Sequence, residues 1–117
     1  MHNFKELKVW KLGIDLTKSI FILTRDFPAE ERYGLTSQMT RCAVSIPSNI
    51  AEGCGKKFDK ELHQFLNIAL GSAFELETQL IIAKDFDYIN NESFNSNCSL
   101  LTEIQKMIYG LQRSLKS

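Results

Sequence analysis

Apolar residues recur at steps of three and four along most of this chain, and that spacing predicts four amphipathic helices. The first extends from Phe4 to about Asp26. The second begins near Thr36, a residue suited to an N-cap, and the third runs from about Lys60 to Phe86. The fourth carries its apolar positions between Leu100 and Leu115. Strand-like alternation is absent, so the pattern predicts an all-α fold.

Short breaks separate these segments at Phe27–Gly34, Gly53–Asp59 and Asp85–Ser93. The second break offers two glycines suited to a helix end, followed by Asp59 as the next cap. Short connections favour antiparallel neighbours. We therefore predict a single domain over residues 1–117, built as an up-down-up-down four-helix bundle.

The stretch VSIPSNIAEG, Val44–Gly53, places a proline inside the second helix. Its apolar residues stay on one stripe across Pro47, and Ile46 would be a poor N-cap for a helix starting at Pro47. We therefore predict a continuous helix with a proline kink. The alternative is a helix that ends at Ile46, with a loop before the next one.

The first helix has two apolar stripes. One, from Val9 to Phe27, suits a bundle core, whereas the other lies roughly 150° away on the helix. This second stripe predicts contact with another subunit, unless a neighbouring helix of the same subunit covers it. Its members are Leu7, Trp10, Ile14 and Phe21.

Composition limits the partners. Of 117 residues, 44% are hydrophobic, and 14 Lys and Arg balance 14 Asp and Glu, so bulk charge does not attract nucleic acid or an anionic membrane. The charged N-terminal stretch lacks a secretory signal, and we expect a cytoplasmic protein. Apolar runs are shorter than the ~20 residues of a membrane span. The three cysteines lack metal-ligand spacing, so reduced thiols are expected.

Three stretches resemble one known family: FKELKVWKLGIDL, FPAEERYGLTSQMTRCAVSIPSNIAEG and FLNIALGSAFELETQLIIA. They are similar to four-helix bundle proteins encoded in intervening sequences of bacterial 23S ribosomal RNA genes. That family includes the accessory variability determinant of diversity-generating retroelements. The resemblance implies a ring-forming homopentamer without established enzymatic activity. The retroelement branch resembles a reverse transcriptase partner that binds RNA through a markedly basic surface, and the zero net charge of this chain departs from that pattern.

Two basic groups are candidate RNA contacts. Lys8, Lys11, Lys18 and Arg25 lie within about a quarter-turn on the first helix, interrupted by Asp15, and Lys56, Lys57 and Lys60 surround the aromatic Phe58. A solvated charged face, and an aromatic packed on its own fold, are the alternatives.

The polar face of the second helix is a candidate subunit or ligand contact. Short side chains such as Ser and Asn specify close hydrogen bonds, whereas a merely soluble face is usually rich in Lys and Glu. Ser45 and Asn49 are one turn apart and could bond each other or the carbonyls freed by Pro47. A wet surface is the alternative. The candidate interface residues on this face are Arg41, Ser45, Asn49 and Glu52.

Catalytic patterns are missing from the sequence. His2 and His63 lack the HExxH or CxxC context of a metal site, and Glu75 and Glu77 point to different sides of their helix. We expect no cofactor, no metal and no enzyme activity. The leading hypothesis is an oligomeric interaction module that binds RNA or an RNA-associated protein. A protein-binding ring without nucleic-acid contact is the alternative, and an enzyme with a site between subunits is a third.

Overall fold

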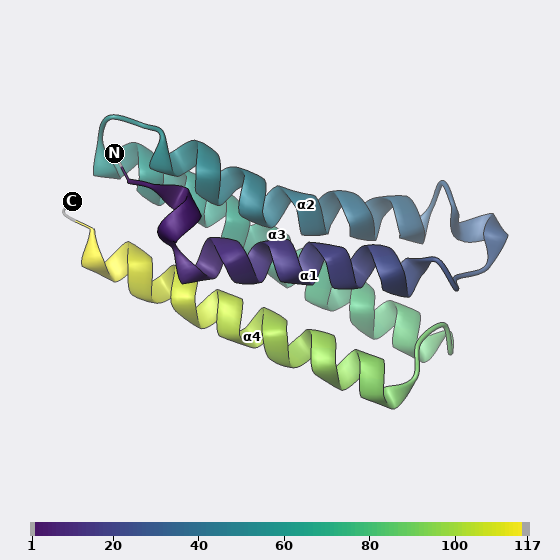
Figure 1. Cartoon of the computed structure of the whole chain (residues 1–117). Helices are drawn as coiled ribbons and strands as arrows, with labels where there is room; N and C mark the ends of the chain where they lie inside the picture. The colour runs from purple at the N-terminus through teal and green to yellow at the C-terminus, as the bar shows by residue number, and fades with distance from the viewer. Residues whose placement is uncertain (1, 116–117) are drawn as a thin grey trace.

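A computed structural model describes residues 2–115 as a bundle of four α-helices. They are α1 (Lys8–Thr24), α2 (Leu35–Cys54), α3 (Asp59–Asp85) and α4 (Asn91–Ser114). Short 3-10 turns, η1 (Phe4–Glu6) and η2 (Ala29–Glu31), precede α1 and α2. Consecutive helices run antiparallel and pack on each other, and α4 also packs against α1 (Figure 1). The all-α up-down-up-down prediction is confirmed for these residues.

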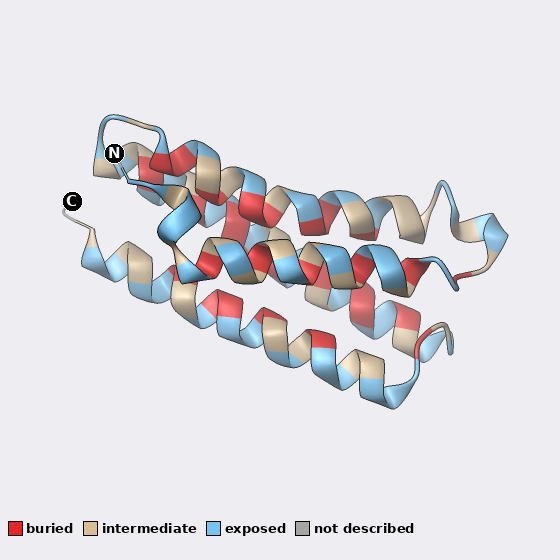
Figure 2. Cartoon of the chain, in the orientation of Figure 1, coloured by how far each residue is buried: buried red, intermediate tan, exposed pale blue. Residues whose placement is uncertain are grey.

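All four helices turn their apolar stripes inward, and their exposed faces form the outside of the bundle (Figure 2). The core positions are those expected from the three-and-four spacing, because that spacing places them on one side of each helix. The largest fully buried side chains are Leu16, Ile20, Met39, Ile46, Ile50, Leu62, Leu66, Leu76, Leu80, Leu101, Ile104 and Ile108.

The helix starts differ from the sequence predictions. The first segment is not one helix, because Leu7 has extended backbone angles and separates η1 from α1. Thr36 is not the cap of α2, which begins at Leu35, where the Glu31 side chain accepts the Leu35 amide at 3.2 Å. Similarly, α3 begins at Asp59 itself, and extended Phe58 occupies the cap position. The observed starts of α2 and α3 thus lie one residue before those predicted.

Pro47 lies inside α2, which continues past it to Cys54 as predicted. A proline at this position leaves the Ala43 carbonyl without its helical amide partner. The Thr17 hydroxyl of α1 lies 3.1 Å from this carbonyl and 2.8 Å from the Gly13 carbonyl, so its single proton serves these two acceptors. A Cβ on Gly13 would lie 3.3 Å from the Pro47 Cβ. The proline thus sits at a close approach between α1 and α2.

Gly53 has a packing role that the sequence analysis missed. It lies inside α2, and a Cβ there would come within 2.8 Å of the Phe65 Cβ and 2.9 Å of the Leu62 Cδ1. The glycine therefore lets the end of α2 touch the start of α3. Gly55 follows as the C-cap with an ordinary negative φ of −79°.

The helix α3 is the longest in the described range and is apolar enough, by length and composition, to cross a membrane. A core helix meets the same criterion, and here the Leu and Ala positions of α3 are buried against the rest of the bundle. Its outer face is nevertheless unusually apolar, as described below.

Candidate functional site

The second apolar stripe of α1 is only partly open to solvent. Leu7 and Trp10 pack against the subunit's own core, and the Trp10 ring meets Phe4 of η1 edge-on, with centroids 5.1 Å apart. Ile14 is half-buried, whereas Phe21 is 47% exposed. The turn η1 therefore covers one end of the stripe within the subunit, and Phe21 remains as its open end.

Phe21 shares a shallow hollow with the outer side of α2. Val44, itself 41% exposed, lines the same hollow together with Ser45 and Ser48. This small apolar patch, which we call the α1–α2 patch, consists of Phe21 and Val44. It lies beside Arg41, whose exposed side chain also borders the hollow.

The polar face of α2 makes hydrogen bonds inside the subunit. Asn49 donates to the Ser45 carbonyl at 2.8 Å and to its hydroxyl at 2.9 Å, and the Ser45 and Ser72 hydroxyls are 2.9 Å apart. Ser45 and Asn49 thus bond each other, as predicted, while the Pro47-freed carbonyl is served from α1 instead. Arg41 and Glu52 remain exposed on the outer side of α2.

Cys42 extends this network toward the core. Its thiol donates to the Ser72 carbonyl at 3.1 Å. Burial, reinforced by nearby Glu75, raises the pKa of Cys42 to about 12, and burial also raises the pKa of Cys54 and of Cys98. These thiols are therefore protonated near neutral pH and poorly suited to nucleophilic or metal chemistry. Within residues 2–115, no three His, Cys, Asp or Glu side chains gather as a metal site would require.

The outer side of α3 presents a second, larger apolar surface. We call it the α3 outer face, defined by Ile68, Phe74, Ile81 and Ile82, which are 51%, 45%, 46% and 42% exposed. Among the exposed residues from Asn67 to Ile82, Glu75 is the one charged side chain. Gly71 lies on this face with open space around its Cα. This face is the clearest apolar feature outside the core.

The basic stripe of α1 is exposed along its length. Lys8 pairs with Glu103 of α4 at 3.8 Å, whereas Lys11 and Lys18 do not form the ion pairs with Asp15 that their spacing allows. Lys11, Lys18 and Arg25 are exposed and form no ion pair with any residue of the described range 2–115. They cover roughly 21 Å, given a rise of 1.5 Å per helical residue.

The loop lysines before α3 are engaged with aromatic rings. Lys56 lies 5.3 Å from the centroid of Phe65, and Lys57 lies 5.5 Å from that of Phe58. Phe58 is 61% exposed, and Lys60 is exposed on the first turn of α3. The second basic group therefore spans the loop before α3 and the first turn of that helix.

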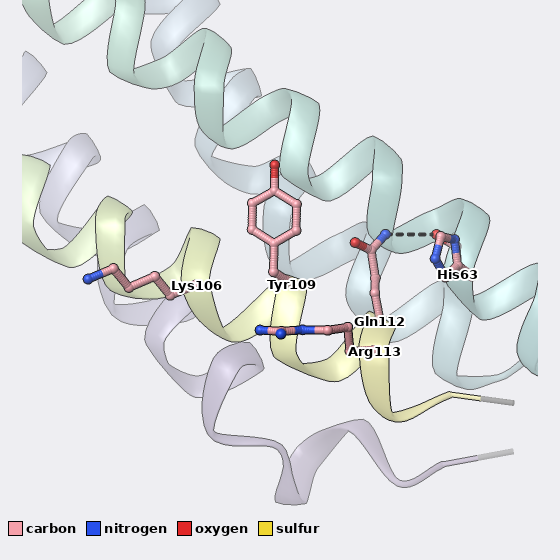
Figure 3. A pocket seen from close by; sticks show the side chains of 5 residues that line it. All are labelled: His63, Lys106, Tyr109, Gln112 and Arg113. Carbon is pink, nitrogen blue, oxygen red and sulfur yellow. Dashed lines mark hydrogen bonds between the residues drawn. The ribbon is translucent and has the colours of Figure 1, made fainter.

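A groove of about 580 Å³ between α3 and α4 was missed by sequence analysis. Lys106, Tyr109 and Arg113 of α4 line it, and Gln112 of α4 donates to the His63 carbonyl of α3 at 3.3 Å (Figure 3). Gln112 also donates to the Asn67 side chain at 2.7 Å. The signal lay in the spacing of Lys106, Tyr109 and Arg113 at i, i+3 and i+7, which places them on one side of α4.

Comparison with known proteins gives a family and a fold. The sequence profile of the family described as 23S rRNA-intervening sequence protein matches residues 5–110. A crystal structure from Bacteroides thetaiotaomicron, described as a protein of unknown function from the S23 ribosomal protein family, superposes with a TM-score of 0.81. It is 24% identical, and the match covers 91% of this chain and 99% of that one, which establishes the shared fold. No curated protein matches the chain.

Proposed function

This chain belongs to the 23S rRNA-intervening sequence protein family, and we propose that it is a non-catalytic interaction module that assembles with copies of itself. The observation that carries the proposal is the α3 outer face. Ile68, Phe74 and Ile81 lie on a helix whose other side already fills the core, so nothing within the described subunit covers them further.

The apolar area on α3 is large enough to favour association. Complete burial of one Ile or Phe side chain is worth roughly 1.5–3 kcal/mol, so covering the exposed half of three of them contributes about 2–4 kcal/mol. Glu75 is the one charge to be accommodated on this surface. Exposed Gly71 lets a partner helix approach the backbone closely.

Two different apolar surfaces favour a ring. The α3 outer face and the α1–α2 patch are separate surfaces: within the described residues Phe21 lies on α1, which makes no contact with α3, whereas Val44 lies on α2, which packs on α3 through its other side. Contact between two unlike patches is heterologous, and it closes into a ring when the rotation per subunit permits. We propose such a homo-oligomer, with the α2 bend at Pro47 shaping the contact; the family resemblance favours five subunits.

Mixing complementary variants tests this arrangement. Phe74→Glu removes one patch, and Phe21→Glu removes the other, while both residues are half-exposed and dispensable for the core. Light scattering should show each variant as a monomer and the mixture as a one-to-one dimer, because each variant keeps one intact patch. Trp10→Glu is unsuitable, since Trp10 packs on Phe4 and the core.

Ile22→Glu is the matched control, because Ile22 is 58% exposed on α1 but belongs to neither patch. It should assemble like the unaltered chain. A monomeric unaltered protein at micromolar concentration contradicts the proposal. Full assembly of Phe74→Glu alone contradicts the role of the α3 outer face.

RNA binding along α1 is a second candidate function, favoured by the outward line of Lys11, Lys18 and Arg25. Cations that neutralise phosphates give an affinity that falls steeply with salt, whereas an apolar protein contact does not. Retention of RNA should weaken in Lys11→Glu with Lys18→Glu, and Lys84→Glu on α3 is the control. If RNA is not retained, or if its retention does not depend on salt, the second candidate function is wrong and the module is a purely protein-binding scaffold.

A further inference from the structure

The groove between α3 and α4 combines an aromatic ring with two cations. Tyr109 is 48% exposed, so part of its ring is open to a ligand. Lys106 and Arg113 stand one turn away on either side of it along α4, and both are exposed. Figure 3 shows the three side chains leaving the same stretch of the helix.

Within residues 2–115, no carboxylate forms an ion pair with the cations of this groove. The ion pairs within residues 2–115 are Lys8 with Glu103 and His2 with Asp59, and neither includes Lys106 or Arg113. The remaining lining residues, His63 and Gln112, bring no carboxylate to the groove. An anionic group placed between the two cations therefore meets attraction without a competing negative partner.

The shape of the groove is fixed by contacts between the helices. Gln112 uses its amide to hold the Asn67 side chain and the His63 carbonyl, which ties the end of α4 to the start of α3. Gly110 follows Tyr109 with nothing within 4 Å of where a Cβ would stand, so the outer side of the helix stays open there. At about 580 Å³ the groove is of the size that accommodates small ligands.

We propose that this groove binds a phosphorylated nucleobase unit, with the base stacked on Tyr109 and the phosphate oxygens accepting from Lys106 and Arg113. An aromatic ring stacks on any base, and a guanidinium donates to phosphate in a bidentate fork. The same chemistry is offered by a free nucleotide and by an unpaired nucleotide in single-stranded RNA. The site is separate from the α1 cations and independent of self-association.

Titration of the full chain with named probes tests the proposal. Adenosine 5′-monophosphate, adenosine, a short single-stranded oligoadenylate and an RNA duplex of equal length are compared by calorimetry or fluorescence anisotropy. Binding of the monophosphate and the single strand, with little binding of adenosine or duplex, supports the site. Binding of the monophosphate alone identifies a free nucleotide as the ligand, and binding of the single strand alone identifies RNA.

Variants separate the parts of the site. Tyr109→Ala should lower the affinity roughly 5- to 100-fold, whereas Tyr109→Phe should keep it. Lys106→Gln and Arg113→Gln should each reduce the slope of log affinity against log salt by about 1. Both cations are on the surface, so these two variants retain the fold, as circular dichroism can verify.

Tyr33 and Arg32 form the matched control. Tyr33 is 87% exposed with the Arg32 guanidinium 5.4 Å from its ring, yet Tyr33 stands on the turn before α2 and does not line the hollow that Arg32 borders. Tyr33→Ala should leave binding unchanged. The proposal is overturned if no probe binds, if Tyr109→Ala binds like the unaltered protein, or if Tyr33→Ala loses as much affinity. Equal binding of an acidic peptide that competes for the groove also overturns it.

Discussion

At the scale of single residues, side chains in this bundle often serve a neighbour rather than their own helix. Thr17 of α1 serves the carbonyl that Pro47 leaves free in α2, and the Ser45 hydroxyl of α2 bonds the Ser72 hydroxyl of α3. Gly53 carries no Cβ and so leaves room for the Phe65 side chain of α3. Their importance follows from what they touch across a helix interface.

Gly53→Ala should destabilise the protein, by roughly 1–3 kcal/mol, because the new methyl overlaps Phe65 and Leu62. Gly110→Ala is the matched control in an open position, where alanine is better than glycine in a helix by up to about 1 kcal/mol. Urea unfolding of both variants measures the difference. Equal changes in the free energy of unfolding would mean that Phe65 and Leu62 shift to accommodate the new methyl without cost.

Alkaline pH should weaken the fold through Cys42. Its pKa is about 12 in the folded protein against an ordinary 9.0, so above about pH 9 the unfolded chain loses a proton that the native chain retains. The free energy of unfolding therefore falls as pH rises from about 9 toward 12 and is unaffected by this group below that range. Urea midpoints across this range should fall less steeply in Cys42→Ala. Cys98→Ala, at a half-buried thiol, should change the slope less.

At the scale of elements, α2 depends on α1 for its integrity. The helix continues through Pro47 because α1 supplies what the proline removes, namely a hydrogen-bond donor from Thr17 and space at Gly13. The kink predicted from Pro47 stays a prediction. The helix α2 is therefore continuous because α1 packs against it at the proline.

A double-mutant cycle tests this dependence. Thr17→Val should cost roughly 1–3 kcal/mol, because the Ala43 carbonyl loses its buried donor. Pro47→Ala restores a backbone amide to that carbonyl, so Thr17→Val should cost about 1 kcal/mol less in that background. Thr78→Val is the control, since Thr78 bonds only Phe74 of its own helix. Additive effects would show that Thr17 does not serve the proline.

At the scale of the whole molecule, the surfaces of the bundle differ from one another in polarity and charge. The α3 outer face is apolar, the outer side of α1 is basic, and the α3–α4 groove combines cations with an aromatic ring. A chain with zero net charge thereby carries surfaces of distinct chemical character.

Assembly should make thermal stability depend on concentration. A partner that binds only the folded subunit raises the melting temperature with concentration by mass action. Calorimetry at increasing protein concentration should show a rising Tm for the unaltered chain and a constant Tm for Phe74→Glu. A Tm independent of concentration in both would argue against association through α3.

The sequence by itself determined the four helices, their antiparallel order and the core, because periodic apolar residues fix which side of each helix turns inward. It also indicated that α2 continues through Pro47, since Ile46 and Ile50 stay in phase across it. The tertiary structure decided what local pattern cannot express. Gly34 and Phe58 occupy the cap positions expected at Thr36 and Asp59, and at the start of α2 the Glu31 carboxylate accepts the Leu35 amide. The groove brings together Lys106 and Tyr109 of α4 and His63 of α3 only because the two helices pack together. The pattern of polar residues along one helix does not show which other helix that polar face will meet.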